Sequence, residues 1–351
     1  MKISKIVHPV GIYGFAALGG WLMSATGSPL PWMIGPLIAT ALLYLAGVTT
    51  YIIPVRTRPL GQIIVAAQVG LSFSPAALGK LLDLMPLLVG MALLTAGCAC
   101  LVAFVLSRIS GTGLVASLLS TIPTSPVEAA IIAERMGLPP GPIIFAQTLR
   151  IASIVVLVPI TIYAIDGWPD RQGLTSAQDF DAFGSLLLIA AAVTAAFVFR
   201  FLRISNPFFL GALAASAALT AFGTTPAPFP PAVLSVAQIL LGTWLGSTFR
   251  RSLFVSAGRT VASIGLSTLL FLGLTTITGY ALSIFLGMTW EDLVLGAAPG
   301  GVTEMALTAK YLELDVALIT AFHLVRIFMI VPAIPAIARL LQRHEERRAA
   351  G

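Results

Sequence analysis

The sequence predicts an all-α protein, a polytopic transmembrane helical bundle with two inverted repeats, each containing a discontinuous helix. Three observations lead to this prediction. The 351 residues are 58% hydrophobic and only 10% charged, whereas soluble domains carry about 25% charged residues. The chain aligns with itself at one constant offset. Each aligned half also holds a proline- or glycine-rich interruption inside an otherwise apolar segment.

Apolar runs long enough to cross about 30 Å of hydrocarbon recur along the chain. Clear examples lie at 84–106, 141–165, 185–201 and 261–286. The N-terminal apolar run is rich in glycine and continues directly into another span at Pro31, so we expect a retained first helix and not a cleaved signal peptide. In the first copy six apolar segments are expected, near 8–25, 31–48, 59–78, 82–108, 112–136 and 140–166.

The self-alignment has a constant offset of 176 residues. It pairs rare intramembrane residues without a gap: Pro31 with Pro207, Gly35 with Gly211, Gln62 with Gln238, Pro123 with Pro299, Glu128 with Glu304, and Arg150 with Arg326. Such a register indicates a tandem duplication. We therefore expect a first membrane repeat at 1–175 and a second at 176–351, within a single integral membrane domain.

The distribution of charge predicts the orientation of the copies. Arginine and lysine residues border alternate span ends and both termini, whereas the 166–183 link carries four aspartates and one arginine. The positive-inside rule then places both termini in the cytoplasm and the link outside the inner membrane. Five segments per copy would cross and the interrupted one would re-enter, with Lys80 as a small violation. A broken helix that crosses, with another segment failing to cross, preserves the same parity.

The first interruption reads "PTSPVE", from Pro123 to Glu128. The two prolines have no backbone N–H, so they release the carbonyls of Leu119 and Ile122 from helical pairing. Helix then restarts with Ser125 as N-cap, Pro126 at the first helical position, and a glutamate three residues after the cap.

The second copy breaks at Pro299, Gly300 and Gly301 and restarts before Glu304. Broken helices of this kind form the substrate and ion sites of secondary transporters. The expected substrate-binding residues are Ser125, Glu128, Arg150, Gly300, Gly301, Thr303, Glu304 and Arg326.

The charged residues of the breaks have two interpretations. Glu128 and Glu304 suit helix caps, but a charge at bilayer depth is costly and usually functional. Arg150 and Arg326 lie within apolar spans. They could pair with the glutamates as structural links, or receive an anionic substrate together with the exposed N–H groups of the helix restarts. Both interpretations can hold at once.

Three further polar residues are candidates. His323 stands where the first copy has Gln147. It is either a packing residue or, with Glu128 and Glu304, a proton-linked group. Gln62 and Gln238, matched across the copies, are expected to line a cavity, although they could instead bond neighbouring helices.

Several classes of chemistry have no matching pattern. The sequence contains no Gly-x-x-x-x-Gly-Lys-Ser/Thr loop for ATP, and no His and carboxylate cluster for copper or iron. Cys98 and Cys100 are expected to be packing residues. We expect no cofactor or metal, no nucleic-acid partner and no enzymatic activity. The net charge of +6 reflects orientation in the membrane.

The chain resembles the AbrB-type membrane protein family in "LPWMIGPL", "GQIIVAAQVGLSF" and "PTSPVEAA". The resemblance covers about 5–343. It implies a duplicated membrane domain, and the family carries the labels of gene regulator and ammonia monooxygenase. More distantly the chain is similar to the cation/proton antiporter and anion transporter superfamily. It departs from the antiporters by having Arg150 and Arg326 in place of an intramembrane aspartate pair, which favours an organic anion.

The sequence thus predicts an ion-coupled secondary transporter of a small, anionic organic solute, working by alternating access. The broken helices would form a core that moves against a scaffold of the first two spans of each copy. The coupling ion would be a proton or sodium, the bilayer is an obligatory partner, and a homodimer remains open. The alternative is a membrane-bound regulator of gene expression that acts through a partner.

Overall fold

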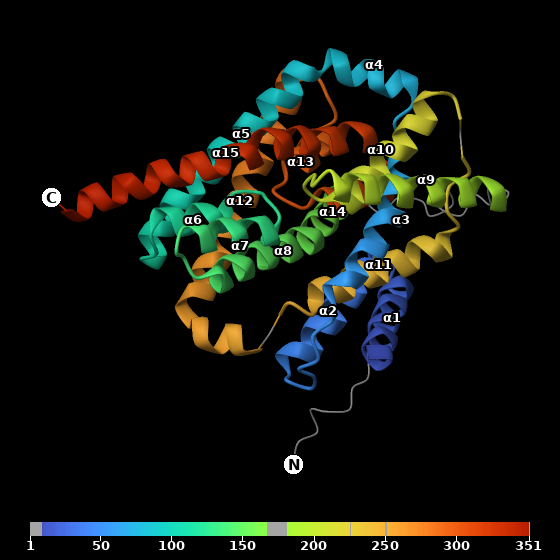
Figure 1. Ribbon diagram of the computed structural model, residues 1–351. Helices are drawn as coiled ribbons and strands as arrows, with labels where there is room; N and C mark the ends of the chain where they lie inside the picture. Colours follow the sequence, from blue (N-terminus) through green and yellow to red (C-terminus); the bar gives the residue numbers. More distant parts are fainter. Residues whose placement is uncertain (1–8, 167–180, 225, 250, 351) are drawn as a thin grey trace. The chain divides into compact units, whose positions relative to one another are not determined.

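The structure is a computed structural model that describes residues 9–166, 181–224, 226–249 and 251–350 (Figure 1). All regular secondary structure within those ranges is helical, which confirms the predicted all-α class. The first copy contains α1 (Pro9–Ala25), α2 (Pro31–Leu45), η2 (Val55–Thr57), α3 (Arg58–Gly70), α4 (Pro75–Asp83), α5 (Met85–Ser110), α6 (Leu114–Thr121), α7 (Pro126–Arg135) and α8 (Pro140–Asp166). The second contains α9 (Ala182–Phe201), α10 (Pro207–Ala221), α11 (Pro231–Gly246), α12 (Arg251–Leu286), α13 (Trp290–Ala297), α14 (Val302–Tyr311) and α15 (Val316–Ala350).

Five helical stretches of the described chain are long and apolar enough to cross a membrane. They are Met85–Ser110, Pro140–Ile165, Ala182–Phe201, Val261–Leu286 and Val316–Arg343. This agrees with the predicted multi-pass membrane protein. The helices α2, α10 and α11 are apolar but shorter. Most of the acidic link (167–180) and the N-terminal lysines (within 1–8), on which the orientation was predicted, fall outside the described residues.

The apolar segment expected near 59–78 contains a bend. Helix α3 ends at Gly70 and α4 begins at Pro75, with an 86° bend between them. The reason is local, because Pro75 has no N–H to continue a helix. The Ser74 hydroxyl accepts a bond from the amide of Ala77 at 3.2 Å and so starts a new helix.

The helix bounds support the duplication. Helices α2, α6 and α7 reappear 176 residues later as α10, α13 and α14 with the same lengths. The unusual backbone at the start of α2 recurs as well, since Leu30 and its counterpart Asn206 both have positive φ, 43° and 48°. The inverted orientation of the two copies stays a prediction.

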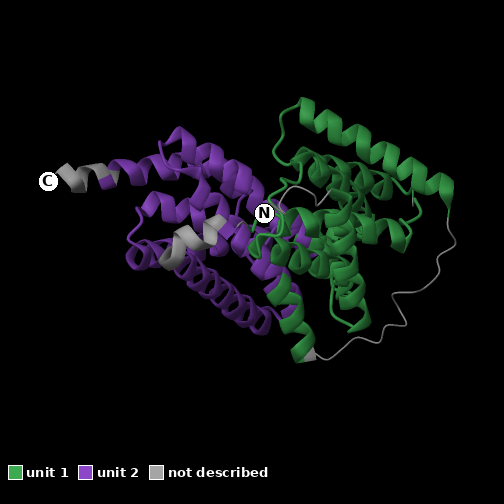
Figure 2. Cartoon of the chain, turned by 90° about the horizontal axis from the view of Figure 1, so that it is seen from below, with its two compact units in different colours: residues 1–83, 156–250, 306–317 green, residues 84–155, 251–305, 318–351 purple. Residues whose placement is uncertain are grey.

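The chain folds into two compact units that both draw on the two copies (Figure 2). Unit 1 comprises residues 1–83, 156–250 and 306–317, and unit 2 comprises 84–155, 251–305 and 318–351. Unit 1 therefore collects the leading helices of each copy. From each copy, unit 2 collects the long helix before the break (α5 and α12), most of the broken helix (α6 with α7, and α13 with α14), and the greater part of the long helix after the break (α8 and α15).

Close helix packing characterises unit 1. Helix α2 packs against α1 and α11, and α10 packs against α9 and α3 in the matching way. At Gly35 a Cβ atom would collide with the backbone of Gly19, and at Gly211 it would lie 2.6 Å from the carbonyl oxygen of Ala195. Small residues at such crossings let membrane helices approach closely. The glycine pair that marks the repeat thus has a packing role.

In unit 2, a hydrophobic cluster surrounds the first break. Leu118, Leu119 and Ile122 at the end of α6 pack in one cluster with Ala129 of α7 and Phe271 of α12. The broken helix is therefore enclosed by protein on these sides. Freed backbone groups at such a place must find partners within the protein.

Candidate functional site

The first break occurs where the prolines predict it. Helix α6 ends at Thr121 and α7 restarts at Pro126, with Ser125 as an extended N-cap residue. The side-chain amide of Gln147, fully buried on α8, donates to the carbonyls of Leu119 at 2.6 Å and Ile122 at 2.9 Å. These are the two carbonyls whose donors the prolines remove. The predicted release is confirmed, and Gln147 is the compensating donor.

Arg150 closes the end of the same half-helix. Its Nη1 donates to the carbonyls of Ser120 and Thr121, and its Nη2 donates to Gln147 Oε1 at 2.6 Å. The side chain is 3% exposed. A cation at a helix C-terminus pairs with carbonyls that have no intrahelical partner and with the negative end of the helix dipole. Arg150 and Gln147 thus form one network that caps α6.

The second break repeats this geometry. Helix α13 ends at Ala297 and α14 restarts at Val302. Arg326, 2% exposed on α15, donates from Nη1 to the carbonyl of Ala298 and from Nη2 to that of Gly300, both at 2.8 Å. Within unit 2 the guanidinium groups of Arg150 and Arg326 are close enough to repel each other. Each keeps a buried Nε–H without a hydrogen-bond partner.

The glutamates lie on the restarting half-helices. Glu128 accepts a bond from the Thr124 hydroxyl at 2.9 Å. The carboxylate of Glu304, 8% exposed, lies directly against Gly301, the residue before α14, as expected for a first-turn glutamate that folds back over its helix start. Ser125 occupies the cap position, but its hydroxyl makes no capping bond.

The arginine contacts show one structural role of these charges. Arg150 and Arg326 donate to carbonyls of the breaks; a pairing of either arginine with Glu128 or Glu304 stays a prediction. Thr303, 2% exposed, and Gly300 stand at the same helix start. Whether these residues also bind a solute stays a prediction.

His323 is the point at which the two breaks differ. It occupies the place of Gln147 and is fully buried. The backbone of Leu295, the counterpart of Leu119, interacts with the ring, but neither ring nitrogen has a hydrogen-bond partner of regular geometry. The second break therefore has one good capping side chain where the first has two.

This difference gives a stability prediction. Exchanging His323 for glutamine is expected to raise unfolding stability by about 1 kcal/mol, because the amide can donate to carbonyls as Gln147 does. The reciprocal change, Gln147→His, is expected to lower it by about 1–3 kcal/mol, since buried carbonyls lose their donor. Thermal unfolding of both variants in detergent measures the effect. A His323→Gln protein less stable than the unchanged one would mean that the imidazole makes a contact that glutamine cannot replace.

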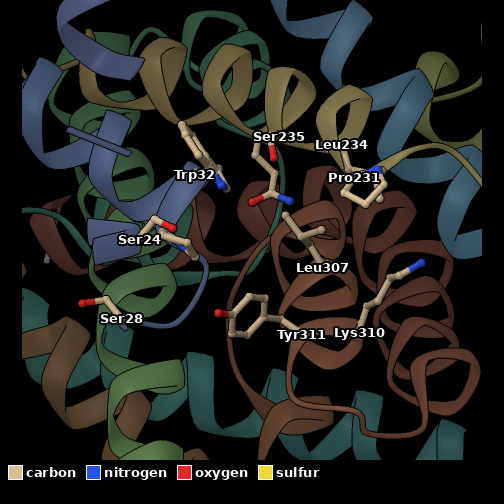
Figure 3. Close-up of a pocket in the computed structure, with 11 residues that line it drawn as sticks. Ser24, Ser28, Trp32, Pro231, Leu234, Ser235, Leu307, Lys310 and Tyr311 are labelled. Carbon is tan, nitrogen blue, oxygen red and sulfur yellow. The ribbon is translucent and has the colours of Figure 1, made fainter. Parts of the chain in front are cut away.

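Unit 1 contains a cavity of about 370 Å³ (Figure 3). Three parts of the chain form it. Ser24, Ser28, Pro31 and Trp32 come from the α1–α2 connection; Pro231, Leu234, Ser235 and Gln238 from α11; and Leu307, Lys310 and Tyr311 from α14. In Figure 3 Lys310 and Tyr311 project from α14 below the residues of α11, and Ser24, Ser28 and Trp32 lie at the left of the view. The same short helix α14 thus carries Glu304 at its start and cavity residues at its end.

The cavity lining is rich in hydrogen-bond donors. Lysine, serine, tyrosine, tryptophan and glutamine side chains face it, and none of the eleven lining residues is a carboxylate. Tyr311 also packs against Tyr163 of α8, with ring centroids 6.2 Å apart. An ammonium group among neutral donors, beside the apolar surfaces of Leu234 and Leu307, suits a small anion with an apolar body.

The matched glutamines have different roles. Gln238 lines this cavity; its predicted place at a cavity of the broken helices stays a prediction. Gln62 is buried, donates to Asn206 Oδ1 at 3.2 Å, and does not line it. The reason is an unequal partner: the residue that corresponds to Asn206 is Leu30, which has no side-chain acceptor. The other cavity residues were missed, although one signal was available, since Lys310 is a lysine on a half-helix that follows an intramembrane break.

Comparison with known proteins connects the chain to one family. The profile of the family described as "Transition state regulatory protein AbrB" matches residues 32–342. "Uncharacterized protein YhjN" of Bacillus subtilis (strain 168) is 26% identical over 99% of this chain and 97% of its own length. "Putative regulator AbrB" of Escherichia coli (strain K12) is 24% identical over 97% of this chain and 100% of its own length.

Proposed function

This chain belongs to the AbrB family of membrane proteins, and from that premise and the geometry above we propose that it is a secondary active transporter of a small anionic organic solute. The observation that carries the proposal is the unit 1 cavity, whose lining combines Lys310 with neutral donors and includes no carboxylate. A solute carboxylate would pair with the Lys310 ammonium group. Other oxygen atoms of the solute would accept hydrogen bonds from the Ser235 hydroxyl, the Gln238 amide or the Tyr311 hydroxyl.

The cavity volume limits the size of the solute. About 370 Å³ lies at the low end of the range for small-molecule sites, about 300–1,000 Å³. Trp32, Leu234 and Leu307 offer apolar surface, so the solute would carry a short hydrocarbon part besides its charge. A small mono- or dicarboxylate meets both conditions.

The capped breaks support a transport role. In secondary transporters, discontinuous helices place half-helix ends near the membrane midplane, where the solute and coupling ion bind. Here both half-helix ends are held by buried arginines at the cost of placing two cations in the protein interior. Such a costly arrangement is typical of function. Alternating access would then change the position of α14, which carries both Glu304 and the cavity residues Leu307, Lys310 and Tyr311.

The proposal includes an ion gradient as the source of energy. Glu128, Glu304 and His323 are the candidate proton-linked groups, and sodium remains the other candidate ion. The protein would act in the inner membrane with both termini in the cytoplasm. The carbonyls at each break are bonded to arginine side chains, so the arginines' first task is structural and any contact with solute would use the remaining Nε–H groups.

A ligand screen tests this function. Purified full-length protein is heated in detergent with small mono- and dicarboxylates, amino acids or ammonium, and reconstituted protein is then assayed for counterflow of each stabilising compound. We expect at least one carboxylate to raise the melting temperature and to exchange across the liposome membrane. Stabilisation by ammonium or a cationic solute alone, without a carboxylate response, would contradict the anion proposal.

A membrane-bound regulator is the second candidate, favoured by one observation: the family description and the name of the Escherichia coli relative both refer to regulation. The two candidates are distinguishable. If the protein regulates through a partner and transports nothing, replacing cavity residues such as Ser235 or Gln238 should leave its regulatory effect on gene expression unchanged.

A further inference from the structure

Unit 1 has a second hollow, separate in its lining from the solute cavity. It has a volume of about 740 Å³ and lies among η2, α3, α9 and the start of α10, helices that pack against one another. Seven of the nine lining residues are apolar, the other two are Arg56 and Arg200, and none is acidic. We propose that this groove binds one anionic phospholipid, with its phosphate at the two arginines and an acyl chain along the apolar wall.

The order of residues along the chain fits an amphipathic ligand. On the first wall Arg56 is followed by Leu60 and Ile63, at spacings of four and seven residues. On α9 Arg200 is preceded by Phe197 and Val193, at three and seven. The α9 residues lie on one helix face, as do Leu60 and Ile63 of α3, and Arg56 precedes α3 in the turn η2. Each wall therefore runs from a charge to an apolar end over about 10 Å, at 1.5 Å per helical residue.

The apolar part of the groove faces lipid. Helix α9 is a candidate span, and only 22% of its apolar window is buried inside the protein. Phe197 is 53% exposed and Leu60 is 57% exposed. In a membrane protein such side chains contact hydrocarbon. A soluble anion would leave this wall unused, whereas an acyl chain would cover it.

The charged end is arranged for a phosphate group. Arg200 lies in the last turn of α9, with its guanidinium carbon 5.9 Å from the centroid of the Phe208 ring. Phe208 in turn meets Phe197 edge to face, with centroids 6.1 Å apart. The aromatic contact limits the orientation of the guanidinium group, which binds phosphate oxygens in a forked geometry. Basic residues bordering apolar helices are typical of anionic lipid recognition.

Thermal unfolding in mixed micelles tests the proposal. Full-length protein in detergent receives either phosphatidylglycerol or phosphatidylcholine, and the melting temperature is followed against lipid concentration. Phosphatidylglycerol is expected to stabilise the protein at lower concentration. Arg56→Gln and Arg200→Gln should each weaken that response about fivefold, and the double variant about 25-fold. Arg108→Gln is the matched control, because Arg108 also lies in the last turn of an apolar helix over an aromatic ring, 5.1 Å from Phe104. It should retain the full response.

Two further arms keep the test decisive. Arg56→Lys with Arg200→Lys keeps the charge but loses the forked geometry, so its lipid response should lie between those of the glutamine double variant and the unchanged protein. Inorganic phosphate alone should leave the melting temperature unchanged. Equal stabilisation by the two lipids, an equal loss in Arg108→Gln, a lysine variant that responds no better than the glutamine double variant, or full stabilisation by phosphate would each overturn the proposal. The readout requires no transported solute, so it is independent of the proposed function.

Discussion

Arg326→Gln is expected to lower the stability of the folded protein by about 3–5 kcal/mol, enough to reduce the amount that reaches the membrane in a folded form. Two hydrogen bonds from a charged donor are lost, to the carbonyls of Ala298 and Gly300, and such bonds contribute about 1.5–3 kcal/mol each. The glutamine variant no longer buries a cation, and the desolvation energy that this saves offsets part of the loss. Arg150→Gln should cost less, because Gln147 still donates to two carbonyls at the first break.

The measurement is fluorescence-detected gel filtration after a temperature series. Arg339→Gln is the control, since Arg339 is exposed on the same helix and bonds only the Pro335 carbonyl of its own helix. A double variant separates carbonyl capping from ion pairing. If Arg326 caps the break, adding Glu304→Gln should not restore stability. Recovery in the double variant would show that Arg326 and Glu304 are partners and that the capping account is wrong.

Lys310→Gln is expected to weaken carboxylate binding by about 10- to 100-fold with little loss of folded protein. A charge-assisted hydrogen bond contributes about 1.5–3 kcal/mol, and each 1.4 kcal/mol is a factor of ten in affinity. Stability should change little, because the side chain is only partly buried and glutamine keeps a donor in the cavity. Ligand-induced shifts in melting temperature and counterflow of the stabilising solute both report the loss.

Lys80 provides the comparison for this test. It is the other lysine in the described part of the chain, and it forms a 2.6 Å ion pair with Asp315 away from the cavity lining. Lys80→Gln should leave solute affinity unchanged and cost at most about 1 kcal/mol, as exposed pairs do. Unaltered affinity in Lys310→Gln would place the solute site elsewhere, with the breaks in unit 2 as the next candidate.

The sequence alone determined the features that depend on nearby residues. Hydropathy defined the long spans, and the prolines at 123 and 126 defined both the break and the two carbonyls that would need donors. The 176-residue register identified Arg150 and Arg326 as equivalent, and both donate to backbone carbonyls at their breaks. All of these follow from the absence of a proline N–H or from the cost of polar groups in hydrocarbon, which act within a few residues.

Only the tertiary structure decided which groups satisfy those needs. The donors to Leu119 and Ile122 come from Gln147, more than twenty residues further along the chain, and the unit 1 cavity joins residues near 24, 235 and 310. Residues that match across the repeat do not always have the same role: Gln62 donates to Asn206, whereas Gln238 faces the cavity. A helix face can be inferred from spacing. Its partner depends on how distant helices pack, and a change of one residue, Asn206 to Leu30 across the repeat, accompanies the change in which matched glutamine faces the cavity.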